Sequence, residues 1–176
     1  MTALPANAPR WKANWLWDTG LIVREKVNVV TFMKTNGVNL LYLQIDPSID
    51  AASYKAFIQE LGLSGTKVYA LSGDPHWVLS EQRSNITKTV DWVRAYNAGA
   101  AEGEKFAGVQ MDIEPYLLPE WNTDRNGMIQ NWMDAITLFL STKQEKHPLR
   151  LRRRFRSGWT LFTYRAPQTT RSFTNG

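Results

Sequence analysis

The sequence predicts an α/β fold of the (β/α) TIM-barrel type, with about four βα units, which is half of a barrel. Strand-like and helix-like segments alternate through the first 146 residues, a pattern typical of βα units and a parallel sheet. The predicted strands start near residues 14, 39, 67 and 106, which are intervals suited to barrel units. An acidic residue also stands at or just after the end of each predicted strand. Because eight units need about 250 residues, this chain has room for about half of them.

The first two units are predicted from hydrophobic spacing. Residues 14 to 18 form the first strand, and residues 24 to 36 form a helix that Gly37 ends. Residues 39 to 46 form the second strand. On one of its faces we expect Leu41, Leu43 and Ile45, and on the other Tyr42, Gln44 and Asp46. The next helix ends near Gly62 and places four residues at i, i+3, i+4 and i+7, namely Tyr54, Phe57, Ile58 and Leu61.

The third and fourth units follow the same plan. Residues 67 to 71 form the third strand, a loop covers residues 72 to 77, and the helix after it presents Ile86, Val90 and Val93. The fourth strand lies within residues 106 to 116. The fourth helix shows an apolar face made of Ile129, Trp132, Met133, Ile136 and Leu140.

The fourth strand carries the most informative motif, in which two carboxylates two residues apart end an otherwise apolar segment. In a β-strand this spacing places Gln110, Asp112 and Glu114 on one face and the apolar side chains between them on the other. Acids at the carboxyl end of a barrel strand are candidates for acid/base chemistry. The alternative is a pair of strand-end carboxylates that bond to loop amides or to a neighbouring Arg.

Three further acids, Asp18, Asp46 and Asp74, end the first three strands. The carboxyl ends of parallel strands share one edge of a sheet, where ligands bind. Each of these acids is also explained as a turn former or a helix N-cap. His76, in the loop after the third strand, is explained in the same way as a turn residue.

Composition narrows the function. The chain has no Cys, which excludes disulfides and thiolate metal sites, and no apolar segment long enough to span a bilayer or to serve as a signal peptide. Residues 1 to 148 hold 14 Lys and Arg against 16 Asp and Glu, a net charge of −2. The basic excess of the whole chain therefore comes from its tail. We expect no nucleic-acid and no membrane partner.

Residues 149 to 176 differ from the rest, since they contain seven Arg, no Lys and no acid. A basic arm is one interpretation. A frameshift is the other, and the genetic code favours it. Read from the third base of each codon, Trp159 and Thr160 must encode Asp, and the codons before them encode mainly apolar residues, as a fifth strand would. The hypothesis is that residues 1 to 148 are a partial barrel and residues 149 to 176 an out-of-frame tail.

The fourth-strand motif resembles family 18 glycoside hydrolases, the chitinase-like enzymes, whose fourth strand reads F-D-G-I-D-I-D-W-E-Y-P. Phe106 and Gly108 match, and Asp112 and Glu114 take the places of the last Asp and the catalytic Glu. Two acids are replaced, by Ala107 and Gln110, and the aromatic–Pro pair is inverted as Pro115-Tyr116. The segment from Asn36 to Tyr42 is also similar to sugar-hydrolase barrels, and D-x-E occurs on a strand of family 25 muramidases.

This resemblance implies a barrel that hydrolyses an N-acetylated polysaccharide without a cofactor. Glu114 would protonate the leaving glycosidic oxygen, and Asp112 would orient the substrate's acetamido group, which acts as the nucleophile. The substrate-binding residues would be Gln110, Tyr116, Trp77, Trp121, Trp17, Asp46 and Asp74, with Trp77 and Trp121 as stacking platforms in rim loops.

Three alternatives stay open. One is a metal-dependent hydrolase that uses Asp18, Asp46, Asp74, His76 and Asp112. Another is a non-catalytic, lectin-like barrel, since Ala107 and Gln110 replace two acids. The third is an inactive half-barrel, whose open sheet edges predict a homodimer.

Overall fold

The computed structural model describes residues 11–142, which form a mixed α/β structure with one four-stranded parallel sheet and six α-helices. The strands are β1 (Ala13–Leu16), β2 (Leu40–Gln44), β3 (Lys67–Ser72) and β4 (Val109–Met111). The α-helices are α1 (Leu21–Arg24), α2 (Lys26–Thr35), α3 (Ala51–Gly62), α4 (Ser84–Ala98), α5 (Glu120–Thr123) and α6 (Arg125–Ser141). Three short 3₁₀ helices join them, η1 (Pro75–Val78), η2 (Glu102–Glu104) and η3 (Pro115–Leu117).

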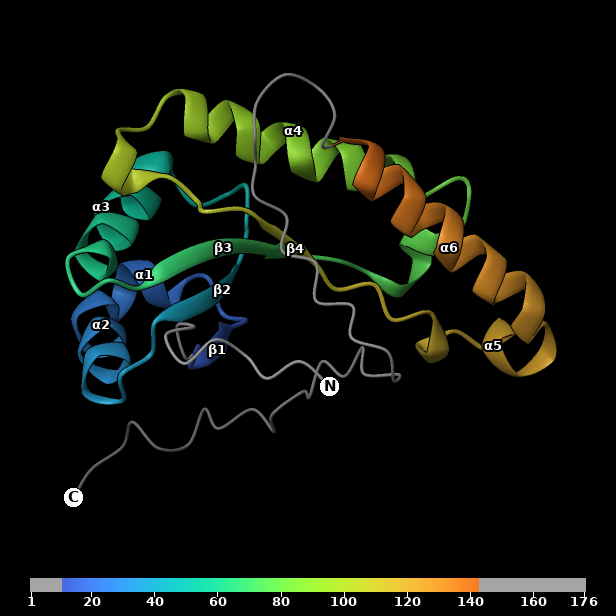
Figure 1. The fold of residues 1–176 in the computed structure, drawn as a ribbon, viewed down its shortest axis with the longest axis horizontal. Coiled ribbons are helices and arrows are strands. Elements are labelled where there is room, and N and C mark those ends of the chain that lie inside the picture. The colour runs from blue at the N-terminus through green and yellow to red at the C-terminus, as the bar shows by residue number, and fades with distance from the viewer. Residues whose placement is uncertain (1–10, 143–176) are drawn as a thin grey trace, which may run out of the picture.

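The four strands lie side by side in the order in which they occur along the chain, β1-β2-β3-β4, and all pairs are parallel. The predicted parallel sheet of βα units is thus confirmed. The larger helices form an arc along one side of the sheet, with α2 and α3 at one end, α4 in the middle and α6 at the other (Figure 1). All four carboxyl ends therefore lie at the same edge.

The two faces of the sheet differ in chemistry. One face packs into the hydrophobic core with the helices, through side chains from neighbouring strands such as Leu43 and Ala70. The other face carries a row of aromatic rings, in which Tyr42 lies 5.1 Å from Trp15 and 5.9 Å from Tyr69 between ring centroids. The predicted faces of β2 are confirmed, because Leu41, Leu43 and Ile45 all belong to the core.

Local sequence signals explain the helix ends. After α2, Gly37 adopts a left-handed φ of 61°, and its amide donates to the carbonyl of Lys34 at 3.0 Å. The Val38 amide donates to the carbonyl of Met33 at 2.9 Å, which completes the Schellman pattern that the glycine predicts. At the start of α3 the Asp50 carboxylate accepts from the amide of Ser53.

The predicted inner faces of α3 and α4 are also confirmed, since all seven apolar residues are buried: Tyr54, Phe57, Ile58, Leu61, Ile86, Val90 and Val93.

Three details differ from the sequence prediction. The first predicted helix is two helices, because Glu25 has a non-helical φ of −133° between α1 and α2. β4 has only three residues, so Asp112 and Glu114 lie beyond the strand. On α6 the predicted apolar face is only partly inward: Trp132, Ile136 and Leu140 are half-buried, whereas Ile129 and Met133 are exposed. The fully buried residues of this helix are Met128 and Ala135.

No described helix is long and apolar enough to cross a membrane. The Arg-rich segment 149–176, and with it the frameshift hypothesis, lies outside the described residues.

Candidate active site

The end of β4 places Asp112 at the carboxyl edge of the sheet, directly beside the end of β3. The amide of Asp112 donates to the carbonyl of Ser72 at 2.9 Å, so the ladder continues one residue past the strand. The residue directly after β3 is Gly73, which lies against the backbone of Asp112. A Cβ at Gly73 would lie 1.9 Å from the Asp112 carbonyl oxygen, so no residue with a side chain fits at this position without a shift of the backbone. The position of Asp112 therefore depends on a glycine opposite it.

Glu114 comes two residues later, at the N-cap of η3. The hydroxyl of Tyr116 donates to Glu114 Oε1 at 2.5 Å, within the same turn. The Pro115 ring is fully buried and anchors this turn. The carboxylate is thus held by a partner two residues away on a rigid turn.

Aromatic side chains surround this turn. Tyr116 is 45% exposed, and its ring meets Trp121 edge to face with centroids 6.5 Å apart. The guanidinium of Arg125 lies 5.4 Å from the centroid of the Trp121 ring, a cation–π contact that holds the indole. The predicted residues Glu114, Tyr116 and Trp121 are therefore brought together, and the rings offer the flat apolar surfaces that stack on sugars.

Gln110, another predicted substrate-binding residue, lies within strand β4. It is half-buried in β4, and its side-chain amide donates to the carbonyl of Met111 at 3.2 Å. Its register partner on β3 is Leu71, which belongs to the face opposite the helices. Gln110 thus lies on the same side of the sheet as the aromatic row.

The other three strand-end acids each serve a local turn. Asp18 forms an ion pair with Arg24 and accepts from the amide of Gly20 at 3.1 Å. Asp46 accepts from the amide and hydroxyl of Ser48, at 2.9 and 2.7 Å, and these bonds hold the pKa of Asp46 below its usual value. Both side chains are exposed at the edge of the sheet.

Asp74 caps η1 and pairs with His76. Its Oδ1 accepts from the amide of His76 at 2.8 Å and lies 2.7 Å from the Nδ1 of the same residue. Burial raises the pKa of Asp74, but the two bonds from His76 and its charge outweigh that effect and lower it. The turn-former interpretation thus accounts for the contacts of all three acids.

The predicted tryptophans lie in different surroundings. Trp17 follows β1 and is 39% exposed. Trp77, on η1, is half-buried and lines two hollows. The first hollow, of about 400 Å³, is open and is bordered by Asp74, His76 and Glu81. Asp74 and Trp77 are thus brought together at the end of β3.

Among residues 11–142, no three His, Cys, Asp or Glu side chains are grouped in a way that could hold a metal ion. Comparison with family models, with curated proteins and with solved structures finds no match for this chain.

Sequence reasoning missed two contributors to this edge of the sheet. Gly73 lies in the loop after β3, as predicted, but its close contact with the Asp112 backbone was not predicted. A glycine directly after a buried strand is the signal for such an approach. The polar residues Asn85 and Lys88 of α4 were also missed. Their spacing with Thr89 and Trp92, at i, i+3, i+4 and i+7, was the available signal.

Proposed function

We propose that this chain is a glycoside hydrolase-like protein that acts on an N-acetylated polysaccharide, with Glu114 as the general acid and Asp112 assisting. The observation that supports this most is the placement of Asp112 and Glu114 immediately beyond the fourth strand of a parallel sheet, with Tyr116 and Trp121 beside them. Carboxylates flanked by aromatic rings at this edge suit glycosidic cleavage.

The fold we propose is half of a (β/α)₈ barrel. Strands that pair in chain order, all parallel, with their helices on one face, are the repeating plan of such a barrel. The row formed by Trp15, Tyr42 and Tyr69 is then part of the inner wall, and Gln110 continues that wall toward Asp112.

The hydrogen bond from Tyr116 suits Glu114 to the role of acid. The hydroxyl donates to Oε1 and holds the carboxyl group in its turn. In this proposal the carboxyl group of Glu114 carries the proton that is transferred. When that proton passes to the glycosidic oxygen, the C–O bond breaks and its electron pair stays with the leaving sugar. The acetamido oxygen of the substrate attacks the anomeric carbon, with Asp112 bonded to the acetamido N–H. The Tyr116 bond then stabilises the new carboxylate.

The test is turnover of chitin oligosaccharides by the wild type, Glu114→Gln and the control Glu120→Gln, which changes an exposed acid of α5. We expect Glu114→Gln to lose about 10²- to 10⁴-fold in kcat with little change in binding, and the control to keep full activity. Equal turnover by the wild type and Glu114→Gln would remove Glu114 as the acid. Binding by the wild type without turnover would support the lectin-like alternative. Loss of turnover when metal ions are chelated would support the metal-dependent hydrolase.

A further inference from the structure

A second hollow, of about 300 Å³, lies at the same edge of the sheet on the side of the helices. It is bordered by the loop after β2, by the end of β3, by η1 and by α4. Among the described residues, its lining includes the indoles of Trp77 and Trp92 and, from α4, the side chains of Asn85, Lys88 and Thr89. This volume is at the lower end of the range of small-molecule sites and matches one or two sugar rings rather than a long ligand.

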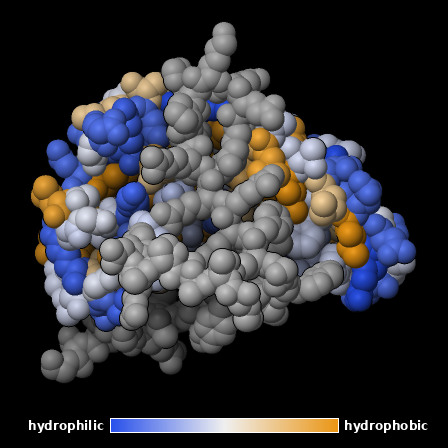
Figure 2. Space-filling view, viewed as in Figure 1, coloured by the Kyte–Doolittle hydropathy of each residue, from blue (hydrophilic) through white to orange (hydrophobic). Residues whose placement is uncertain are grey.

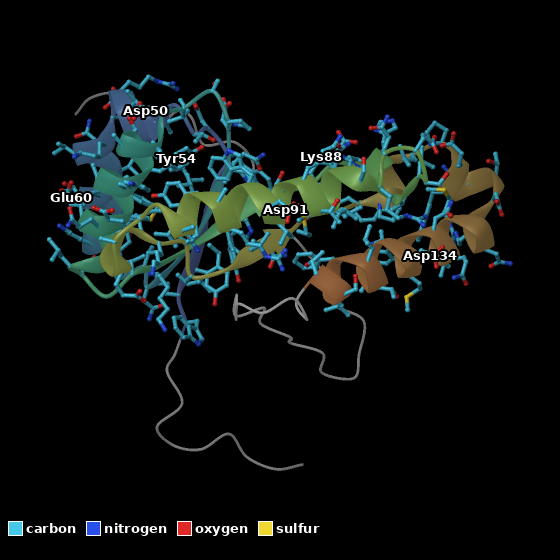
Figure 3. The ribbon with its side chains drawn as sticks, turned by 90° about the horizontal axis from the view of Figure 1, so that it is seen from above. Asp50, Tyr54, Glu60, Lys88, Asp91 and Asp134 are labelled. Carbon is cyan, nitrogen blue, oxygen red and sulfur yellow. The ribbon has the colours of Figure 1, made fainter. Side chains whose placement is uncertain are left out.

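One stripe of α4 forms the polar wall of this hollow. Asn85, Lys88, Thr89 and Trp92 recur at i, i+3, i+4 and i+7, so they share a face of the helix. Figure 3 shows Lys88 on the side of α4 that faces away from α6. The stripe is therefore directed to the space between α4 and the loop after β2.

Trp92 is a rigid wall. Its ring stacks on Tyr96 with an interplanar angle of 14° and a centroid distance of 5.8 Å, and it meets Tyr54 edge to face at 5.7 Å. These contacts hold the indole before a ligand arrives, so binding against it costs little side-chain entropy. Trp77 borders the same hollow from η1.

Among the described residues that line this hollow, Lys88 is the only charged one. Its ammonium donates to Asn85 Oδ1 at 3.3 Å, and within residues 11–142 it takes part in no ion pair. The nearest acid on the same helix, Asp91, pairs with Arg94 instead. A cation beside two indoles and several hydrogen-bonding groups is complementary to an anionic sugar.

The hollow adjoins the proposed active site. Ser72 lines it and also accepts the amide of Asp112 through its carbonyl. Trp77 borders both this hollow and the one beside Asp74 and His76. A single glycan chain that passes over Trp77 would reach both hollows.

We propose that this hollow binds a carboxylate-bearing sugar unit of the glycan, with its carboxylate on Lys88 and its ring against Trp92. This inference rests on the proposed function, and it adds that the natural polysaccharide contains a uronic acid or a similar acidic sugar. The amide of Asn85 and the hydroxyl of Thr89 would bond to sugar hydroxyls.

The experiment is calorimetric binding to the full chain carrying Glu114→Gln, so that turnover does not interfere. The probes are a hyaluronan tetrasaccharide, in which N-acetylglucosamine alternates with glucuronate, and neutral chitotetraose. In this background Lys88→Gln, Lys88→Arg and Lys34→Gln are compared, since Lys34 is an exposed lysine on α2, away from the hollow.

We expect the acidic probe to bind about tenfold more tightly than the neutral one, a preference that Lys88→Gln abolishes and that falls with rising salt. Lys88→Arg should restore most of it, and Lys34→Gln should leave it unchanged. Equal binding of the two probes, or a preference that survives Lys88→Gln, would overturn the inference and leave the proposed function intact. Binding of neither probe would overturn both.

Discussion

The contact between Gly73 and Asp112 shows how a glycine determines the position of a candidate site residue just after the neighbouring strand. The Asp112 amide donates to the carbonyl of Ser72, so the Asp112 backbone passes directly beside Gly73, the residue after β3. Only glycine leaves space for that path. The backbone of Asp112 is therefore placed by its hydrogen bond to Ser72 and by the space that Gly73 leaves.

This contact makes Gly73→Ala a sharp test. A Cβ at this position would lie 1.9 Å from the Asp112 carbonyl oxygen, so the backbone after β4 must move. We expect a loss of about 1–3 kcal/mol in the free energy of unfolding, measured by urea denaturation, because the cost is that of overpacking. Gly103→Ala is the matched control, since no heavy atom lies within 4 Å of its added Cβ. Equal stability of the two variants would contradict the close approach.

Asp50 links the stability of α3 to pH. Its carboxylate accepts from the hydroxyl and amide of Ser53, both at 2.8 Å, and these bonds lower the pKa of Asp50 from its ordinary value. A carboxyl whose pKa is lower in the folded state stabilises the protein above its ordinary pKa, and this contribution is lost as the pH falls through the folded value. Asp46 and Asp74 have the same sign.

We therefore expect Asp50→Ala to lower the midpoint of thermal unfolding at pH 7 and to differ little from the wild type near pH 2. Asp50→Ser keeps a capping oxygen that does not titrate, so its unfolding midpoint should depend less on pH between about 5 and 2. Melting curves across this range measure both effects. A constant difference between wild type and Asp50→Ala at every pH would contradict the role of the charge.

At the scale of the element, α6 shows that an apolar stripe need not face the core. Met128, at 3% exposed, packs with Val78 and Leu118 in a small second cluster, while Met133 is 52% exposed. Figure 2 shows hydrophobic atoms at the surface on the side where α6 lies. The helix has apolar residues on two adjoining faces, and only contact with η1 and α4 selects the buried one.

Two matched substitutions test this orientation. Met128→Ala removes a buried side chain and should cost about 2–5 kcal/mol in the free energy of unfolding. Met133→Ala, on the same helix, should change it by less than about 0.5 kcal/mol. Chemical denaturation of both variants gives the comparison. Similar losses for the two variants would mean that Met133 is buried like Met128.

These elements also show what the sequence can predict. The buried faces of α3 and α4 were predictable because their apolar residues form a single narrow stripe. The length of β4 was not predictable, since its ladder with β3 ends at Ser72 and Met111. A local sequence pattern does not show where a neighbouring strand ends. At the site, the Asp112 and Glu114 spacing was visible, but the partners supplied from β3 were not.

At the scale of the whole molecule, the described sheet has two outer strands, β1 and β4, each with one strand partner. Parallel sheets are normally closed into a barrel or protected at both edges. Helix α6, which carries the exposed Ile129 and Met133, lies at one end of the arc of helices (Figure 1). We expect the chain to form a homodimer that covers these edges.

Sedimentation velocity at several concentrations measures this association. The expected result is a dimer that dissociates on dilution, and Met133→Glu on the outer face of α6 should favour the monomer. Thr137→Glu, on an exposed polar residue of the same helix, is the control and should leave the dimer intact. A monodisperse monomer with a single cooperative melting transition would contradict the expectation.

The order of the strands has a consequence for how the protein folds. Strands β2, β3 and β4 each pair with the strand that precedes them in the chain. Each new pairing therefore closes only the helical segment between two consecutive strands. The sheet can grow strand by strand as the ribosome extends the chain, because β2, β3 and β4 each meet a partner that is already made and only β1 waits for the strand after it. The edge that carries Asp112 and Glu114 is then the last to form, on a platform already built beneath it.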